Sequence, residues 1–135
     1  MAVARPFFDT NVLLYLLSGD QPKANIAESV LIAGGTISVQ VLNEFAAVAT
    51  RKLGMTIVEA REVLTTVRAV CSVVPVTEET HERGLAIAQR YGLSIYDAMI
   101  VASALLSDCT QLLSEDMQDG QVIDKTLTVR NPFRK

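Results

Sequence analysis

Short apolar runs alternate along the chain with longer segments in which apolar residues recur every three or four positions. The first pattern is typical of buried strands and the second of helices that bury one face. We predict strands at residues 4–8, 36–39, 72–76, 111–114 and 127–129. Strands that alternate with helices predict an α/β fold, in which a mainly parallel five-stranded sheet is covered by helices on both faces.

Start and stop residues mark the helices between these strands. The predicted helices are 11–18, 23–33, 40–53, 56–71, 77–91 and 95–107. Thr56 and Glu59 have the spacing of a capping box. Gly19 and Gly34 each follow a predicted helix, so we expect both to end it in the left-handed conformation that glycine adopts without strain.

Four acidic residues lie at the end of an apolar run or inside one: Asp9, Glu44, Asp97 and Asp116. An unpaired carboxylate taken out of water costs several kcal/mol, so each must meet a hydrogen-bond network, a cation or a metal. Glu44 is the hardest to explain structurally. It lies on the helix stripe of Val41, Phe45 and Val48, where no basic residue stands one turn away.

The predicted fold brings these acids to one edge of the sheet. Asp9 and Asp116 follow strands, Asp97 lies in the first turn of its helix, and Glu44 lies near the start of the helix after the second strand. In α/β sheets, ligands bind outside the carboxyl ends of the strands. Hard oxygen ligands at that edge suit Mg²⁺ or Mn²⁺.

Taken singly, three of the four acids also have plain structural explanations. Asp97 stands three residues after Ser94, where it would support a helix cap and favour the helix dipole. Asp9 would cap the first helix, while Asp116 and the nearby Asp119 would be turn residues. The coincidence of all four in one small chain favours a metal site.

Composition and charge limit the other functional classes. The 135 residues, half of them apolar, are expected to form one domain over 1–135. The net charge is −3, so the chain is not a globally basic nucleic-acid binder. The longest apolar segment, 95–106, is too short for a membrane span. Cys71 and Cys109 have no metal-ligand spacing, so we expect small buried residues in a reducing, cytoplasmic compartment.

Four segments, in this order and at this spacing, resemble the PIN domain family: 8–15, 43–44, 94–104 and 113–120. The chain is most similar to the VapC-type toxins of bacterial toxin-antitoxin pairs. The resemblance implies a five-stranded parallel sheet and a Mg²⁺- or Mn²⁺-dependent endoribonuclease whose products carry a 5′-phosphate and a 3′-hydroxyl. It also implies an RNA substrate and a cognate antitoxin protein.

The family's site residues carry over by position. The acidic catalytic and metal-binding positions are Asp9, Glu44, Asp97 and Asp116, and the polar positions around them are Thr10, Asn11 and Ser114. The last segment holds both Asp116 and Asp119, so the fourth metal ligand stays open at this stage. We favour Asp116, directly after its strand, with Asp119 as a supporting or alternate ligand.

Two other classes of protein fit parts of the pattern. A non-catalytic PIN-like module would bind RNA or a protein partner without cleaving it. A phospho-accepting receiver domain would place paired acids after the first strand and a lysine after the last. His81, the only histidine, is expected on an exposed helix face, which disfavours histidine-based ribonuclease chemistry and zinc. We also expect a homodimer, with the helix at 56–71 as the first candidate interface.

Overall fold

A computed structural model describes residues 6–134. Its centre is a six-stranded sheet in the order β3-β2-β1-β4-β6-β5. The strands are β1 Phe7–Phe8, β2 Gly35–Ser38, β3 Cys71–Val74, β4 Gln111–Leu113, β5 Val122–Ile123 and β6 Leu127–Arg130. All neighbouring strands pair in parallel except β5, which is antiparallel to β6. The prediction of a mainly parallel sheet is therefore confirmed.

The sheet has one strand more than the sequence pattern predicts. β5 has only two residues, Val122 and Ile123, and only Ile123 is buried. Asp124 and Lys125, with φ of 48° and 65°, then turn the chain back into β6. So short a strand carries no periodic signal. Residues 4 and 5 of the predicted first strand lie outside the described residues.

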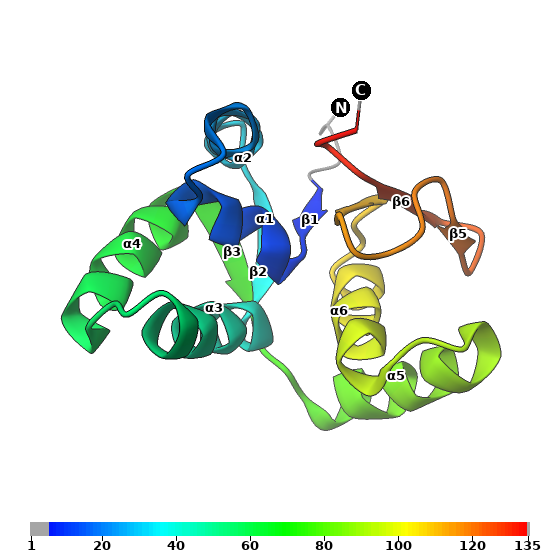
Figure 1. The fold of residues 1–135 in the computed structure, drawn as a ribbon. Helices are drawn as coiled ribbons and strands as arrows, with labels where there is room; N and C mark the ends of the chain where they lie inside the picture. The colour runs from blue at the N-terminus through cyan, green and yellow to red at the C-terminus, as the bar shows by residue number, and fades with distance from the viewer. Residues whose placement is uncertain (1–5, 135) are drawn as a thin grey trace.

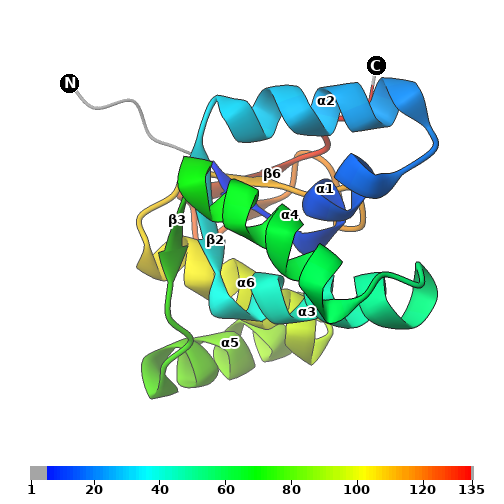
Figure 2. The ribbon, with the colours of Figure 1, turned by 90° about the vertical axis from the view of Figure 1, so that its left-hand side faces the viewer.

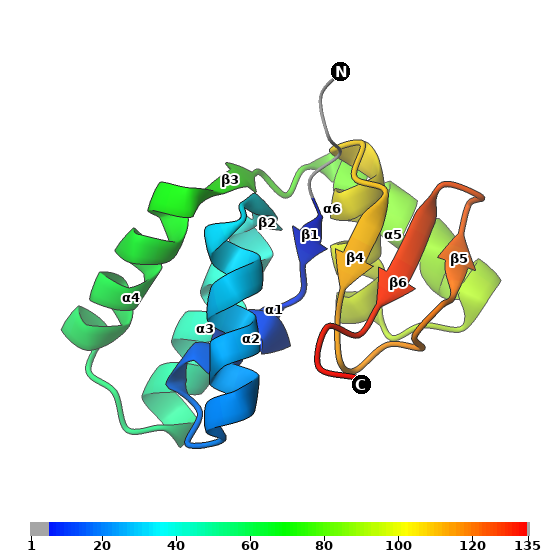
Figure 3. The same ribbon diagram turned by 90° about the horizontal axis from the view of Figure 1, so that it is seen from above.

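Helices cover the sheet on both faces, as predicted. They are α1 Thr10–Leu14, the 3₁₀ helix η1 Tyr15–Leu17, α2 Gln21–Ile32, α3 Val39–Lys52, α4 Ile57–Val70, α5 Glu78–Tyr91 and α6 Ile95–Leu106. Figures 1 and 3 show α1 to α4 on one side of the sheet and α5 with α6 on the other. Figure 2 views the molecule from the side of α1 to α4. None of the helices in residues 6–134 is long and apolar enough to cross a membrane.

Local capping explains most helix ends. The capping box predicted for α4 is present, since Glu59 N donates to Thr56 Oγ1 at 3.1 Å and Thr56 N donates to Glu59 Oε1 at 2.9 Å. Gly34 follows α2 with φ 93°, as expected. The expectation for Gly19 is wrong, because its φ is not positive. The first helix instead continues as the 3₁₀ helix η1, which is followed by Ser18, a residue with extended backbone angles.

The core explains why β1 can deliver a charged residue to the sheet edge. Phe7 and Phe8 are both fully buried, so β1 lies between the two helical layers. Each buried aromatic side chain contributes on the order of 2 kcal/mol. Cys71 and Cys109 are also buried and His81 is exposed, as the sequence predicts.

The order in which strands are added across the sheet reverses between β1 and β4. From β1 the chain passes through two successive connections to β2 and β3, and α5 and α6 then carry it back to β4 on the other side of β1. Phe8 pairs with Leu113, and Asp9 N continues the ladder by donating to Leu113 O at 3.0 Å. The crevice outside the carboxyl ends of β1 and β4 is thus the place where such folds bind ligands.

Candidate metal site

Asp9 directly follows β1 and caps α1. Its side chain is buried, with 5% of the residue exposed. One carboxylate oxygen, Oδ1, accepts a hydrogen bond from Thr10 N at 2.7 Å. The other, Oδ2, accepts from Ser114 Oγ at 2.7 Å and from Asn11 Nδ2 at 3.2 Å. Asp9 is therefore the expected helix cap and also the centre of a polar network.

The charge on Asp9 is only partly compensated. Burial raises its pKa to about 6, although hydrogen bonds from Ser114 and Thr10 act to lower the pKa. Negative charge on Asp97 and Asp116 raises the pKa further. None of the ion pairs among residues 6–134 involves Asp9. A buried carboxylate next to other negative charges favours the binding of a cation, because the cation offsets that charge.

Glu44 lies in the second turn of α3 and is half-buried. Thr10 Oγ1 donates to its Oε2 at 2.8 Å, and Gln40 Nε2 donates to its Oε1 at 2.7 Å. Gln40 Nε2 also donates to the Tyr96 carbonyl at 3.1 Å. Neutral donors thus take the place of the missing basic residue. Gln40 is not among the predicted site residues, although its position one turn before Glu44 could have indicated this contact.

Asp97 lies in the first turn of α6, which Ser94 caps by accepting from Asp97 N at 3.3 Å. The carboxylate is half-buried. Burial raises its pKa, a hydrogen bond with Ser94 lowers the pKa, and the charges of Asp116 and Glu44 raise it. Asp97 thus takes part in the helix cap and is also electrostatically coupled to the other acids.

Asp116 is exposed and is held near Asp9 by neutral residues. Asn11 Nδ2 donates to Asp116 Oδ2 at 3.1 Å as well as to Asp9. Ser114, which is fully buried, accepts from Asp116 N at 3.2 Å while it donates to Asp9. Asn11 and Ser114 therefore link the loop after β4 to the end of β1.

Asp119 lies outside this network. Its Oδ1 accepts from Asn131 N at 2.9 Å, and its Oδ2 forms an ion pair with Arg134 Nη1 at 3.3 Å. Both carboxylate oxygens thus contact the C-terminal segment. Of the two acids in this loop, the structure joins Asp116 to the Asp9 network and Asp119 to the segment after β6.

A second polar cluster beside the site was not predicted. Lys23 Nζ donates to Glu115 Oε2 at 2.7 Å and to the Tyr15 hydroxyl at 3.0 Å, and the Tyr15 hydroxyl donates to Glu115 Oε1. The hydrogen bond from Lys23 lowers the pKa of Glu115. Asn11 Oδ1 also accepts from Glu115 N at 3.2 Å. The cluster ties the residue before Asp116 to η1 and α2, which are remote in sequence.

The donor set fits a hard divalent cation. In the described part of the chain, no three His, Cys, Asp or Glu side chains lie close enough together to form a ready-made metal cage. Mg²⁺ does not require one, because it binds through one or two carboxylates and keeps several waters. All four candidate ligands are carboxylates: negative charge on Asp97 and Asp116 raises the pKa of Asp9, and negative charge on Asp116 and Glu44 raises the pKa of Asp97. Both cysteines, the soft thiol ligands of the chain, are buried in the core.

Comparisons with known proteins identify the family and the fold. The sequence profile of the PIN domain matches residues 7–118. The structure is similar to one described as a toxin-antitoxin complex from Klebsiella pneumoniae, with 24% identity, a TM-score of 0.71, and coverage of 94% of this chain and 97% of that chain.

Two further structures show the same fold. Mycobacterium tuberculosis VapC20, described as a sarcin-ricin loop cleaving toxin, has 19% identity and a TM-score of 0.67 over 82% of this chain and 88% of that chain. FitAcB from Neisseria gonorrhoeae has 15% identity and a TM-score of 0.65 over 96% of this chain and 99% of that chain. No curated protein sequence matches the chain.

Proposed function

This chain belongs to the PIN domain family, and we propose that it is a Mg²⁺- or Mn²⁺-dependent endoribonuclease. One observation carries the proposal. The Asp9 carboxylate is buried at the end of β1, where the strand order reverses. Burial raises its pKa to about 6, and the negative charges of Asp97 and Asp116 also raise it. A site with this excess of negative charge supports the binding of a cation, and cation-assisted hydrolysis suits a phosphodiester substrate.

Asp9, Glu44, Asp97 and Asp116 would hold the metal. A bound divalent cation would lower the pKa of a water molecule and offset the negative charge that develops on the phosphate. Asn11 fixes the carboxylates of Asp9 and Asp116 relative to each other. Such positioning before the substrate arrives is what accelerates hydrolysis.

The biological setting that we propose is a toxin-antitoxin pair in the cytoplasm. One structure similar to this chain is described as a toxin-antitoxin complex, and another is described as a sarcin-ricin loop cleaving toxin. The partner would be a small antitoxin protein. The chain itself would form a homodimer, for which the exposed Ile57 and Val58 on α4 offer apolar surface.

An RNA cleavage assay tests the proposal. The purified protein is incubated with end-labelled single-stranded RNA in Mg²⁺, in Mn²⁺ and in EDTA. We expect cleavage only with metal, and products with a 5′-phosphate and a 3′-hydroxyl. Asp9→Asn and Asp97→Asn, which remove a charge with almost no change in volume, should each lower the rate by about a hundredfold or more.

Two results would overturn the proposal. One is near-wild-type cleavage by either variant. The other is RNA that is bound but stays intact in every metal, which would identify a non-catalytic module instead. Circular dichroism of each variant shows whether the fold is retained.

A further inference from the structure

We propose that the groove beside Glu44 binds unpaired RNA nucleotides next to the cleaved bond, with Tyr96 stacking on a base and Arg51 contacting a phosphate. This inference rests on the proposed ribonuclease function and deepens it. The groove has a volume of about 700 Å³ and is open to solvent. Glu44 forms part of its wall, so the groove adjoins the candidate metal site.

One stripe of α3 forms the groove on one side. Gln40, Glu44, Ala47 and Arg51 follow one another at spacings of three or four residues, so they share one helix face. Glu44 and Arg51 are seven residues apart, which corresponds to about 10 Å along the helix axis. Arg51 is therefore placed to contact a phosphate neighbouring the one at the acids.

Tyr96 stands on the other side of the groove. Its residue is 72% exposed, and the Tyr96 hydroxyl makes no hydrogen bond to another described residue. Only its carbonyl is held, by Gln40 Nε2, which also contacts Glu44. The ring therefore contributes nothing to the core, while the backbone that carries it is held beside Glu44. An exposed ring next to a polar groove suits stacking with an unpaired base.

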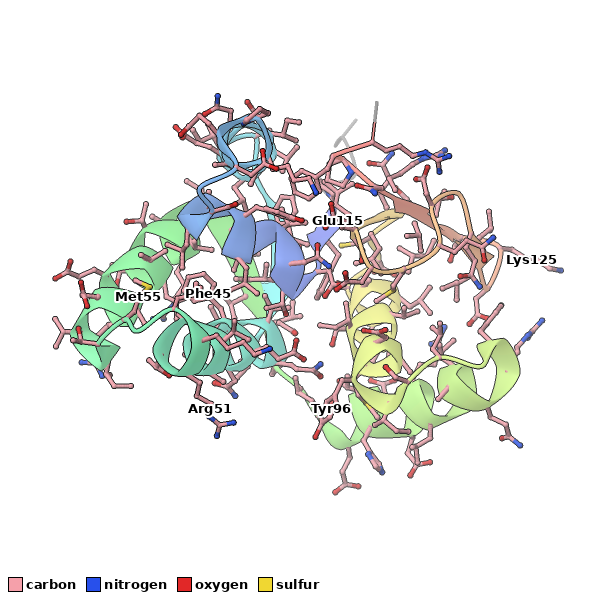
Figure 4. All side chains as sticks on the ribbon, in the orientation of Figure 1. Phe45, Arg51, Met55, Tyr96, Glu115 and Lys125 are labelled. Atoms are coloured by element: carbon pink, nitrogen blue, oxygen red, sulfur yellow. The ribbon has the colours of Figure 1, made fainter. Side chains whose placement is uncertain are left out.

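The charge of Arg51 complements a nucleic acid rather than the protein. Arg51 is exposed in the last turn of α3 and forms none of the ion pairs found in residues 6–134. Figure 4 shows Arg51 and Tyr96 projecting from the same side of the molecule. Val39 and Val76, 40% and 43% exposed, add apolar surface to the groove that a base can cover.

The test measures binding of a short, unstructured, fluorescent RNA by anisotropy, in an Asp97→Asn background that leaves the RNA intact. Tyr96→Ala should weaken binding by about tenfold, and Tyr96→Phe should bind as the parent does, because stacking needs only the ring. Arg51→Ala should weaken binding and reduce the slope of log affinity against log salt by about 0.7, while Arg51→Lys keeps the slope. Both side chains are exposed, so neither substitution removes core packing.

Lys125→Ala is the matched control. Lys125 is an exposed cation near β5, remote from the groove in Figure 4, and its loss should leave both affinity and salt slope unchanged. The inference is overturned if Tyr96→Ala and Arg51→Ala both bind RNA within about twofold of the parent. That result would indicate that the groove binds a protein partner and not RNA.

The same variants separate this inference from the proposed function. If the wild-type protein cleaves no RNA but binding still depends on Tyr96 and Arg51, the ribonuclease proposal fails and the groove assignment stands. If the wild-type protein cleaves RNA and both alanine variants bind as the parent does, the groove assignment fails alone.

Discussion

At the scale of single residues, the Asp9 carboxylate is held by three donors and still has a raised pKa. Thr10 N, Ser114 Oγ and Asn11 Nδ2 all donate to it, yet burial outweighs them. The ionised form of Asp9 therefore lowers the stability of the metal-free fold. A bound cation would remove that cost, which links metal binding to folding.

This link predicts a pH dependence for the metal-free protein. Asp9 has a pKa of about 6 in the fold against an ordinary value of 3.8, so the folded state holds the proton more tightly. The cost of ionising Asp9 is absent below about pH 4 and complete above about pH 6. Relative to Asp9→Asn, the wild-type protein should lose about 3 kcal/mol of unfolding free energy across this range.

Urea unfolding in EDTA at several pH values measures this difference. Comparison with Asp9→Asn matters because it subtracts the titration of groups such as Glu59 and Glu115, whose pKa values are lowered in the fold. Parallel pH profiles for the two proteins would contradict the account.

Asn11 provides a prediction about positioning. Its amide joins Asp9 to Asp116, and Asn11→Ala should lower the cleavage rate by about 10- to 100-fold, as expected for a residue that orients metal ligands. The losses from Asn11→Ala and Asp116→Asn should not add in the double variant. Asn25→Ala is the control, since Asn25 is exposed and its amide oxygen accepts from Gln21 within α2. Additive losses would show that Asn11 acts independently of Asp116.

At the scale of elements, the sequence predicts those features that depend only on residues close together in the chain, such as helix caps. The α4 capping box was identified because Thr56 and Glu59 are three residues apart. The acids Asp9 and Asp97 were identified because each breaks an apolar run. Caps and periodicity are local features, and they were sufficient to predict the fold class and the candidate acids.

Contacts between remote segments could not be predicted in this way. Lys23 and Glu115 are 92 positions apart, and nothing in their local sequence pairs them. The position of Asp116 directly after a strand favours it over Asp119, but only the fold shows that Asp119 meets Arg134. Gly19 has no left-handed conformation because η1 already turns the chain.

Two glycines give a paired test of how elements place the site. A Cβ at Gly35, the first residue of β2, would lie 2.5 Å from Phe8 Cε2 and from the Pro6 carbonyl oxygen. Gly35→Ala should therefore cost about 1–3 kcal/mol of unfolding free energy and displace β1, on which Asp9 depends. A Cβ at Gly19 would meet nothing within 4 Å, so Gly19→Ala should change stability by less than about 0.5 kcal/mol.

Urea denaturation and the cleavage assay check both variants. Gly35→Ala should lose cleavage activity along with stability, while Gly19→Ala should retain both. Equal behaviour of the two variants would contradict the close packing of β1 on β2.

At the scale of the whole molecule, α4 presents apolar surface to solvent. Ile57 and Val58 are each 66% exposed at its start. We predict a homodimer that uses this surface, so Val58→Asp should shift the mass in sedimentation toward the monomer. Val122→Asp is the matched control, because Val122 is 52% exposed on β5 and should leave the mass unchanged. A wild-type protein that is monomeric throughout the micromolar range would refute the dimer.

The central claim is that the acids around Asp9 form a metal site, and thermal unfolding with and without Mn²⁺ tests it most directly. At roughly one hundred times its dissociation constant, Mn²⁺ should stabilise the wild-type protein by about 2.7 kcal/mol. Asp97→Asn, which removes one of the coupled carboxylates, should show a much smaller gain at the same Mn²⁺ concentration. An equal gain in both proteins, or no gain in the wild-type protein, would contradict the metal site.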